Sequence, residues 1–237
     1  MMTPQSDSTA MHAGLLPVFD GGLVEYAAAL ERQLDLHARV LQGQYPRGAM
    51  LLVEHPAVIT IGRHPGAEKH LLAAPELLAA RGVAVHDTDR GGDITFHGPG
   101  QLVAYPIIPL NFYGFGLHDY MRFLEQVVID LLASFKVKGH RLEGATGVWV
   151  YPTERTAPEK ICAMGVKLRR WVSFHGLALN ITTDLSYFEL INPCGLGRPV
   201  TSLASELGSA CPDMSLVKSR IAAHVEQGLA DRLNRPL

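Results

Sequence analysis

The apolar positions along the chain predict helices and strands in an irregular order. Four segments have the periodicity or the flanking residues of helices, and short runs rich in Val, Ile and Leu predict strands between them. The predicted helices cover 22–43, 75–81, 117–135 and about 215–233. The predicted strands cover 49–53, 58–61, 83–86, 147–151, 161–168 and 174–181, with two more inside 93–110 that a tight turn at 97–100 joins.

This order of elements indicates one fold class. Strands follow one another in groups, and helices are inserted irregularly, which favours an α+β fold with a mixed, mostly antiparallel sheet flanked by helices. Residues 1–13 are polar and unpatterned and predict a flexible N-terminus, and the Pro-containing stretch 151–159 predicts a hairpin loop. Because no repeat or linker divides the rest, we expect residues 14–237 to form a single domain.

Composition and charge exclude several classes of protein. The chain has 237 residues, 47% of them hydrophobic, and a formal net charge of −2. It is therefore long enough to bury a large core, and its overall field would attract neither a nucleic acid nor an anionic membrane. The longest stretch without a charged residue, 94–117, contains three prolines and polar side chains, so we expect no membrane span. Three cysteines are too few for a disulfide framework, which favours a cytoplasmic location.

A glycine-rich stretch at 90–101 is the densest unusual feature of the sequence. It holds four glycines and several hydrogen-bonding side chains within twelve positions. If 93–97 is a strand, Asp93, Thr95 and His97 share one face while Ile94 and Phe96 share the other. A polar face over an apolar one suits the wall of a pocket, although two turns around a half-exposed strand would give the same pattern. No phosphate-binding loop motif occurs.

The three cysteines have different local sequences. Cys194 stands in Asn-Pro-Cys-Gly, a turn that would present its thiol to a substrate, so it is a candidate nucleophile or a bystander on a loop. Cys162 lies between apolar residues in a predicted strand, which favours a place in the core. The surroundings of Cys211 give no sign of activation.

A nucleophilic cysteine needs a cation or base nearby, because the thiolate is the attacking species. The candidates are His97, His175, Lys160 and Lys167. The two lysines have opposite parity on one predicted strand, so at most one should face a given pocket, and spacing does not decide which. His175 is equally consistent with a base and with a structural histidine. No short paired spacing of zinc ligands occurs, so we expect no metal.

Four blocks in this order resemble the lipoyl(octanoyl) transferase family over the chain from Gly22 to the last helix. They are RGGDITFHGPGQ at 90–101, KICAMG at 160–165, FHGLALN at 174–180 and NPCG at 192–195. The resemblance implies the fold of biotin and lipoate ligases. It also implies transfer of an octanoyl group from octanoyl-acyl carrier protein, through a cysteine thioester, to a lysine of a lipoyl domain, the first step of endogenous protein lipoylation. The implied acceptors are the lipoyl domains of 2-oxoacid dehydrogenases and the glycine cleavage H protein, and no cofactor is implied.

The resemblance also assigns expected roles to residues. Cys194 matches the catalytic cysteine, and Lys160 matches the lysine paired with it. The expected acyl-substrate contacts are Arg90, Gly91, Gly92, Asp93, Ile94, Thr95, Phe96, His97, Ala163, Met164, Gly165, Gly176, Leu177 and Ala178. A long loop at 153–159 departs from the family's pattern just before Lys160.

Two other functions stay open at the level of the sequence. An ATP-dependent lipoate or biotin ligase would share the fold and the lysine, but it would need an adenylate site and no Cys194. A non-catalytic acyl-binding module would keep the pocket, and its cysteine would be incidental. Loss of activity in Cys194→Ser with retained acyl binding would separate an enzyme from such a module.

Overall fold

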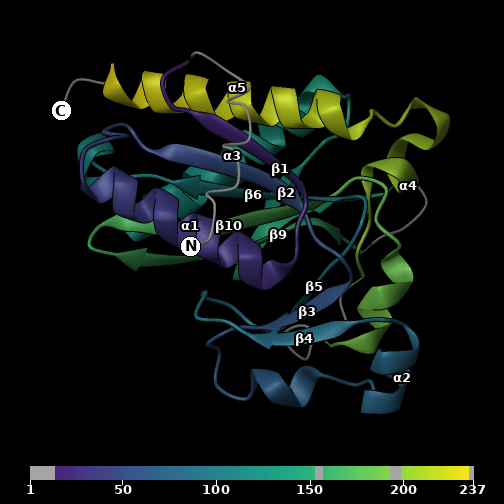
Figure 1. Ribbon diagram of the computed structural model, residues 1–237. Helices are drawn as coiled ribbons and strands as arrows, with labels where there is room; N and C mark the ends of the chain where they lie inside the picture. Colours follow the sequence, from purple (N-terminus) through teal and green to yellow (C-terminus); the bar gives the residue numbers. More distant parts are fainter. Residues whose placement is uncertain (1–13, 153–156, 193–198, 235–237) are drawn as a thin grey trace.

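The structure, a computed structural model, describes residues 14–152, 157–192 and 199–234 (Figure 1). The strands are β1 (Val18–Leu23), β2 (Ala49–Glu54), β3 (Val58–Ile61), β4 (Ala84–Asp87), β5 (Thr95–His97), β6 (Gln101–Ile107), β7 (His140–Leu142), β8 (Ala145–Val150), β9 (Glu159–Arg169) and β10 (Val172–Asn180). The α-helices are α1 (Tyr26–Leu41), α2 (Pro75–Ala80), α3 (Leu117–Ser134), α4 (Leu203–Leu207) and α5 (Met214–Leu233). The short 3₁₀ helices are η1 (Ala67–His70), η2 (Leu110–Tyr113), η3 (Leu185–Leu190) and η5 (Gly208–Ala210).

The strands form two mixed sheets. The large sheet has seven strands in the order β1-β2-β6-β10-β9-β8-β7, and the small one has three in the order β4-β3-β5. Among the described strands, β1 with β2 and β3 with β4 pair in parallel, and the other pairs are antiparallel. The predicted α+β class with a mostly antiparallel sheet is therefore confirmed.

Helices cover the two faces of the large sheet unequally. Helices α3 and α5 pack together on one face, and α1 lies across β2, β6 and β10 on the other (Figure 1). Neighbouring residues of β6 alternate between the two cores, because side chains of a strand point to opposite faces. Leu102 joins the core under α3 and α5, whereas Val103 joins the core under α1. The small sheet and α2 enclose a third apolar cluster around Phe96.

Two edge strands of the large sheet were not predicted from the sequence. Strand β1 pairs with β2, and the register shifts between Asp20 and Gly22, so its apolar alternation is broken. The sequence pattern places its last residue, Leu23, in the first helix, but that helix begins at Tyr26. Strand β7 has three residues, which is too short to give a period. The first 13 residues lie outside the described part of the chain, so the proposed domain boundary stays a prediction.

The predicted turns at 54–56 and 97–100 connect strands of different sheets. Strand β2 belongs to the large sheet and β3 to the small one, and β5 and β6 are divided in the same way. Turn residues indicate where the chain reverses, but they do not indicate which strand each partner pairs with. The strand expected from Asp93 starts two residues later, at Thr95. These two crossings place the glycine-rich stretch where the sheets meet.

A long hairpin of β9 and β10 spans the middle of the large sheet. Its two turn residues, Arg170 and Trp171, both have positive φ angles, 53° and 62°, as a two-residue type I′ turn requires. Strand β8 pairs antiparallel with β9, so the chain from 151 to 158 connects a hairpin, as predicted. Residues 153–156 of that connection lie outside the described residues.

Candidate active site

A cavity of about 300 Å³ opens on the α1 face of the large sheet, where the small sheet approaches it. Its floor includes Ala163 and Gly165 of β9, which pair with Ala178 and Gly176 of β10, and Ala178 pairs in turn with Val103 of β6. Small side chains at these positions leave the space open. The volume falls within the range of sites that hold small ligands.

The other walls come from segments far apart in the chain. The residues that line the cavity are Tyr26, Arg90, Gly92, Asp93, Ile94, Thr95, His97, Val103, Tyr105, Gly144, Ala145, Thr146, Trp149, Lys160, Ala163, Met164, Gly165, His175, Gly176, Leu177, Ala178, Phe188 and Val200. Strands of both sheets, helix α1 and the β7–β8 turn therefore converge on one space. Apolar side chains alternate here with a few polar groups, as in sites for amphipathic ligands.

The glycine-rich segment lies directly against the floor. The backbone N–H of Gly91 donates to Val166 O at 3.0 Å, and a Cβ on Gly165 would lie only 2.5 Å from Gly91 O. A side chain at Gly165 would thus push the segment away. Arg90 is buried, and its Nη2 donates to Thr60 O at 2.8 Å and Thr60 Oγ1 at 2.9 Å. These contacts explain why the segment needs glycine in itself and opposite itself.

A chain of buried hydrogen bonds runs from the cavity wall to Thr201. Gln101 Nε2 donates to Asn180 Oδ1 at 2.9 Å, and Asn180 Nδ2 donates to Thr201 O at 3.0 Å. Gln101 Oε1 therefore faces His97, whose Nδ1 donates to it at 2.7 Å. Burial lowers the pKa of His97 to about 3, so the imidazole is neutral at neutral pH.

Two tyrosines complete the polar side of the cavity. Tyr105 donates its hydroxyl hydrogen to His55 Nε2 at 2.8 Å, because His55 Nδ1 is 2.6 Å from Val24 O and can only donate there. The Tyr26 hydroxyl lies 2.8 Å from Thr88 Oγ1. Burial raises the pKa of both tyrosines and lowers the pKa of His55. All three groups are therefore neutral at neutral pH.

His175 is held in an unusual backbone conformation beside the cavity. Its φ angle is 57°, and left-handed residues other than glycine often mark functional sites. Its Nε2 lies 2.9 Å from Asp89 Oδ1, its backbone N–H donates to Gln33 Oε1 at 2.9 Å, and Asp89 also pairs with Lys167. Burial lowers the pKa of His175, while Asp89 opposes that shift.

Lys160 stands at the head of β9, at the end of the cavity nearest β8. Its Nζ lies 4.7 Å from the centroid of the Trp149 ring, a cation–π distance. Its backbone N–H donates to Pro199 O at 2.9 Å, and its carbonyl accepts from Thr201 N at 3.0 Å. The chain that follows residue 198 is therefore tied to Lys160.

The chain that precedes residue 193 is tied to the glycine-rich segment. The backbone N–H of Asn192 donates to His70 O at 2.8 Å, and His70 Nδ1 lies 2.8 Å from Asp93 Oδ2. The described chain on one side of the interval 193–198 thus attaches to Lys160, which lines the cavity, and on the other side to His70, which contacts the lining residue Asp93. Cys194 itself lies outside the described residues.

Comparison with known proteins identifies the family. The family described as lipoyl protein ligase A/B catalytic domain matches residues 25–226. An octanoyltransferase of Chloroflexus aggregans is 50% identical over 210 residues, which cover 88% of this chain and 92% of that protein. An octanoyltransferase of Porphyromonas gingivalis is 46% identical over 209 residues, 86% of this chain, and the chain spans 42% of that protein's length.

The chain belongs to the octanoyltransferase family. Octanoyltransferases are acyltransferases, so the predicted family and enzyme class are confirmed. A solved structure of lipoate-protein ligase A bound with ATP has a TM-score of 0.62 and 12% identity, and covers 91% of this chain and 83% of that one. At this identity the likeness shows the fold alone, and it confirms the predicted ligase-like fold.

The cavity brings together most of the residues expected to contact substrate in this octanoyltransferase family member. The lining includes Lys160 and the predicted residues Arg90, Gly92, Asp93, Ile94, Thr95, His97, Ala163, Met164, Gly165, Gly176, Leu177 and Ala178. Gly91 and Phe96 do not line it. Gly91 bonds to the neighbouring strand, and the Phe96 ring stacks on Tyr187 with centroids 4.8 Å apart. The functional roles of all these residues stay predictions.

Only one of the two candidate lysines lines the cavity. Lys160 does, whereas Lys167 pairs with Asp89. Strand parity is not the reason, because the register between β8 and β9 shifts at Val148 and Trp149 and interrupts the alternation. Ile161 and Cys162, although adjacent, are both buried in the core under α3 and α5. A bulge of this kind re-aims the side chains beside it.

The other two cysteines fit the sequence interpretation. Cys162 is fully buried, and burial raises its pKa, so its thiol stays protonated. Cys211 is partly buried, and burial raises its pKa as well. Across the described ranges, no three His, Cys, Asp or Glu side chains are grouped to hold a metal ion. Nor does any helix in those ranges combine the length and apolarity of a membrane span.

Several lining residues escaped the sequence interpretation. Tyr26, Tyr105, Trp149 and Phe188 come from four elements, and each has an ordinary apolar place in its own periodic pattern. Nothing local distinguishes them from core residues. Strand pairing and the packing of α1 and η3 bring them to the cavity, and these long-range contacts are not visible in one sequence.

Proposed function

We propose that the protein transfers an octanoyl group from octanoyl-acyl carrier protein to a lysine of a lipoyl domain, through a thioester on Cys194. The thiolate of Cys194, stabilised by the ammonium of Lys160, attacks the carbonyl carbon of the incoming thioester. The bond to the carrier's sulfur breaks, and the departing thiolate takes a proton from Lys160. One thioester replaces another of similar energy, so this step needs no ATP.

The second step restores the starting state. The neutral amine of an acceptor lysine attacks the acyl-enzyme, a C–N bond forms, and the C–S bond to Cys194 breaks. Lys160, neutral after the first step, accepts the proton that the attacking nitrogen loses. Cys194 leaves as a thiolate beside a Lys160 ammonium. The product amide is more stable than the thioester, which drives the transfer forward.

The placement of Lys160 is the observation that carries this proposal. The lysine lines a largely apolar cavity, and its backbone bonds to Pro199 and Thr201, just beyond the interval that contains Cys194. On the other side, Cys194 is two residues along the chain from Asn192, which bonds to His70. These links support a cysteine and a lysine that act together at one end of the cavity.

The small-residue floor supports an acyl chain as the ligand. Ala163, Gly165, Gly176 and Ala178 leave an open surface on the sheet, flanked by Val103. Burial of the seven methylene and methyl groups of an octanoyl chain would contribute roughly 5–6 kcal/mol. That is enough to select chain length coarsely.

Mass spectrometry of the intact protein tests the covalent step. Incubation with octanoyl carrier protein should add one octanoyl group, about 126 Da, which hydroxylamine removes. Cys194→Ser should abolish the adduct, whereas Cys162→Ala and Cys211→Ala should keep it. An adduct of normal yield on Cys194→Ser would sink the proposal.

An ATP-dependent ligase is the alternative, and an assay of transfer to a lipoyl domain, with and without ATP, distinguishes the two. The relatives at 43–50% identity are named octanoyltransferases, which favours transfer without nucleotide. Transfer that strictly requires ATP and uses free octanoate would support the ligase instead. We place the reaction in the cytoplasm, with carrier protein as donor and lipoyl domains as acceptors, on the resemblance to the family.

A further inference from the structure

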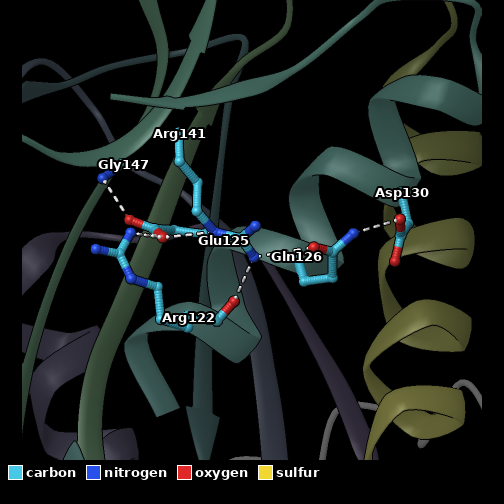
Figure 2. A network of polar contacts seen from close by, with 6 residues as sticks. All are labelled: Arg122, Glu125, Gln126, Asp130, Arg141 and Gly147. Atoms are coloured by element: carbon cyan, nitrogen blue, oxygen red, sulfur yellow. Dashed lines mark hydrogen bonds and ion pairs between the residues drawn. The ribbon is translucent and has the colours of Figure 1, made fainter. Parts of the chain in front are cut away.

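A buried carboxylate lies behind the end of the cavity that Lys160 occupies. Glu125 of α3 has a side chain that is 2% exposed. Its Oε2 accepts from Arg122 Nη1 at 2.7 Å and from Arg141 Nε at 3.1 Å, and its Oε1 accepts from the backbone N–H of Gly147 at 3.2 Å (Figure 2). The network therefore joins α3 to both β7 and β8.

Stability alone does not explain this carboxylate. A buried ion pair contributes little net stability, because desolvation offsets the attraction, and apolar residues of similar size often serve as well. Its two arginine partners are partly exposed, at 43% and 36%, and have water as an alternative partner. The bond to Gly147 differs, since that backbone N–H is buried. The carboxylate is thus the group that fixes Gly147.

Gly147 in turn lies directly against β9. Its φ angle is 114°, and a Cβ at this position would lie 2.5 Å from Cys162 O and 3.6 Å from Lys160 Cε. A side chain on Gly147 would therefore clash with β9 and reach the stem of Lys160. No side chain fits between the two strands, which is why glycine is required here.

Beside this contact, the register between β8 and β9 shifts because β9 carries a bulge. Val148 pairs with Cys162 but Trp149 pairs with Lys160, so Ile161 is the extra residue of a bulge. The Trp149 ring then lies under Lys160 Nζ at 4.7 Å. The residues just before Gly147, Gly144–Thr146, also line the cavity. The position of Gly147 therefore determines both where this part of the cavity wall lies and where the Lys160 side chain points.

We infer that Glu125 is a positioning residue for octanoyl transfer: it holds Gly147 of β8 beside the bulge of β9, and thereby aims Lys160 at the reacting groups. This inference rests on the proposed function, because it assumes that Lys160 acts in the chemistry. Glu125 itself does not touch the substrate. Its loss should lower kcat, with little change in KM, because a reactive group displaced by about 1 Å loses up to about 100-fold in rate.

Two substitutions at Glu125 test this role. Glu125→Leu removes the acceptor for Gly147, and we expect kcat for transfer to fall about 10- to 100-fold while KM changes less than about threefold. Glu125→Gln keeps a carbonyl oxygen for Gly147, and we expect it to restore kcat to within about threefold of wild type. The pH profile of Cys194 alkylation should shift in Glu125→Leu toward that of Lys160→Ala, an effect that lost stability alone would not produce.

A matched control removes a partner of Glu125 that does not hold β8. Arg122→Gln breaks one ion pair but leaves the bond from Gly147 to Glu125, so kcat should stay at the wild-type value. All variants are assayed well below their unfolding temperatures, as circular dichroism defines them. If Glu125→Leu does not fold, Gly147→Ala replaces it, because the added Cβ must displace β8 from Cys162.

The outcomes separate the inference from the proposed function. Full transfer by Lys160→Ala would overturn both, since Lys160 would have no role to be positioned for. Loss of transfer in Lys160→Ala, with wild-type kcat and alkylation profile in folded Glu125→Leu or Gly147→Ala, would overturn the inference and leave the proposed function standing. A kcat loss confined to the variants that disturb Gly147 supports the inference.

Discussion

The two faces of the large sheet are built from the same strands but are filled differently. On the face under α3 and α5, Leu102, Leu177 and Leu179 belong to one continuous apolar core. On the opposite face, the next residues along β9 and β10 include Ala163, Gly165, Gly176 and Ala178, and a cavity opens over them. The first face is closed by packing, and the second is left open beyond the reach of α1.

This difference separates the sources of stability from the sources of function. Large side chains on the core face gain free energy from burial, and a loss of volume there lowers the free energy of unfolding. On the cavity face, small residues and neutral polar groups leave space unfilled and therefore gain less free energy from burial. Single substitutions at adjacent positions of one strand should therefore affect either the free energy of unfolding or the transfer reaction.

Substitution of Lys160, on the cavity face, should have the largest effect on octanoyl transfer. Lys160→Ala should reduce octanoyl transfer by about 1,000-fold or more, because the thiolate loses the cation that stabilises it and the second step loses its proton acceptor. Lys160→Arg should keep much of the fast alkylation at Cys194 but little turnover, since a guanidinium does not act as a base at neutral pH. Rates of alkylation against pH and rates of transfer measure the two effects.

Lys167 is the matched control for this prediction. It lies on the same strand but pairs with Asp89 and does not line the cavity. Lys167→Ala should therefore leave the alkylation profile and the transfer rate near the wild-type values. A profile altered by Lys167→Ala and untouched by Lys160→Ala would reverse the assignment of the two lysines.

Leu179 tests the core face of the same sheet. It is fully buried, and Leu179→Ala should destabilise the protein by about 2–5 kcal/mol, through lost burial and the cavity left behind. Urea unfolding measures this change. Below the unfolding transition, kcat should stay close to wild type. A large loss of kcat in the folded variant would show that the two faces are not independent.

The sequence predicted the elements of the fold better than it predicted the residues of the site. Periodicity located α1, α3, α5 and the long strands, because each has its own local pattern. The resemblance supplied Lys160 and Cys194, which local pattern left as candidates among others. Pairing was not predictable: the bulge at Ile161 and the separation of β2 from β3 depend on partners distant in the chain. Trp149 and Glu125 owe their places to the same distant contacts.

Ala178, the residue before Leu179 on the same strand, tests the cavity face instead of the core face. Ala178→Leu adds volume to the cavity floor, where the side chain of Ala178 faces Val103 across the strand pair. We expect kcat/KM for the octanoyl donor to fall about 10- to 100-fold, and a shorter acyl donor to lose less. Competition between octanoyl and butanoyl carrier protein measures the preference. An equal loss for both donors would mean that the floor does not bound the acyl chain.

The buried polar chain on the cavity face gives the smallest expected effect, a pH dependence of stability. Burial lowers the pKa of His97 to about 3, against about 6.5 in an unfolded chain. Below pH 6.5 the unfolded state binds a proton that the folded state excludes, so stability falls as the pH drops toward 3. Between pH 7 and 5.5 the loss from this one group is about 1 kcal/mol.

His97→Gln should remove this loss and flatten the curve of unfolding free energy against pH by that amount. His118→Gln, at an exposed position of α3, should leave the curve unchanged. Urea unfolding at the two pH values makes the measurement, and parallel curves for wild type and His97→Gln would show that His97 is not held neutral in the folded protein.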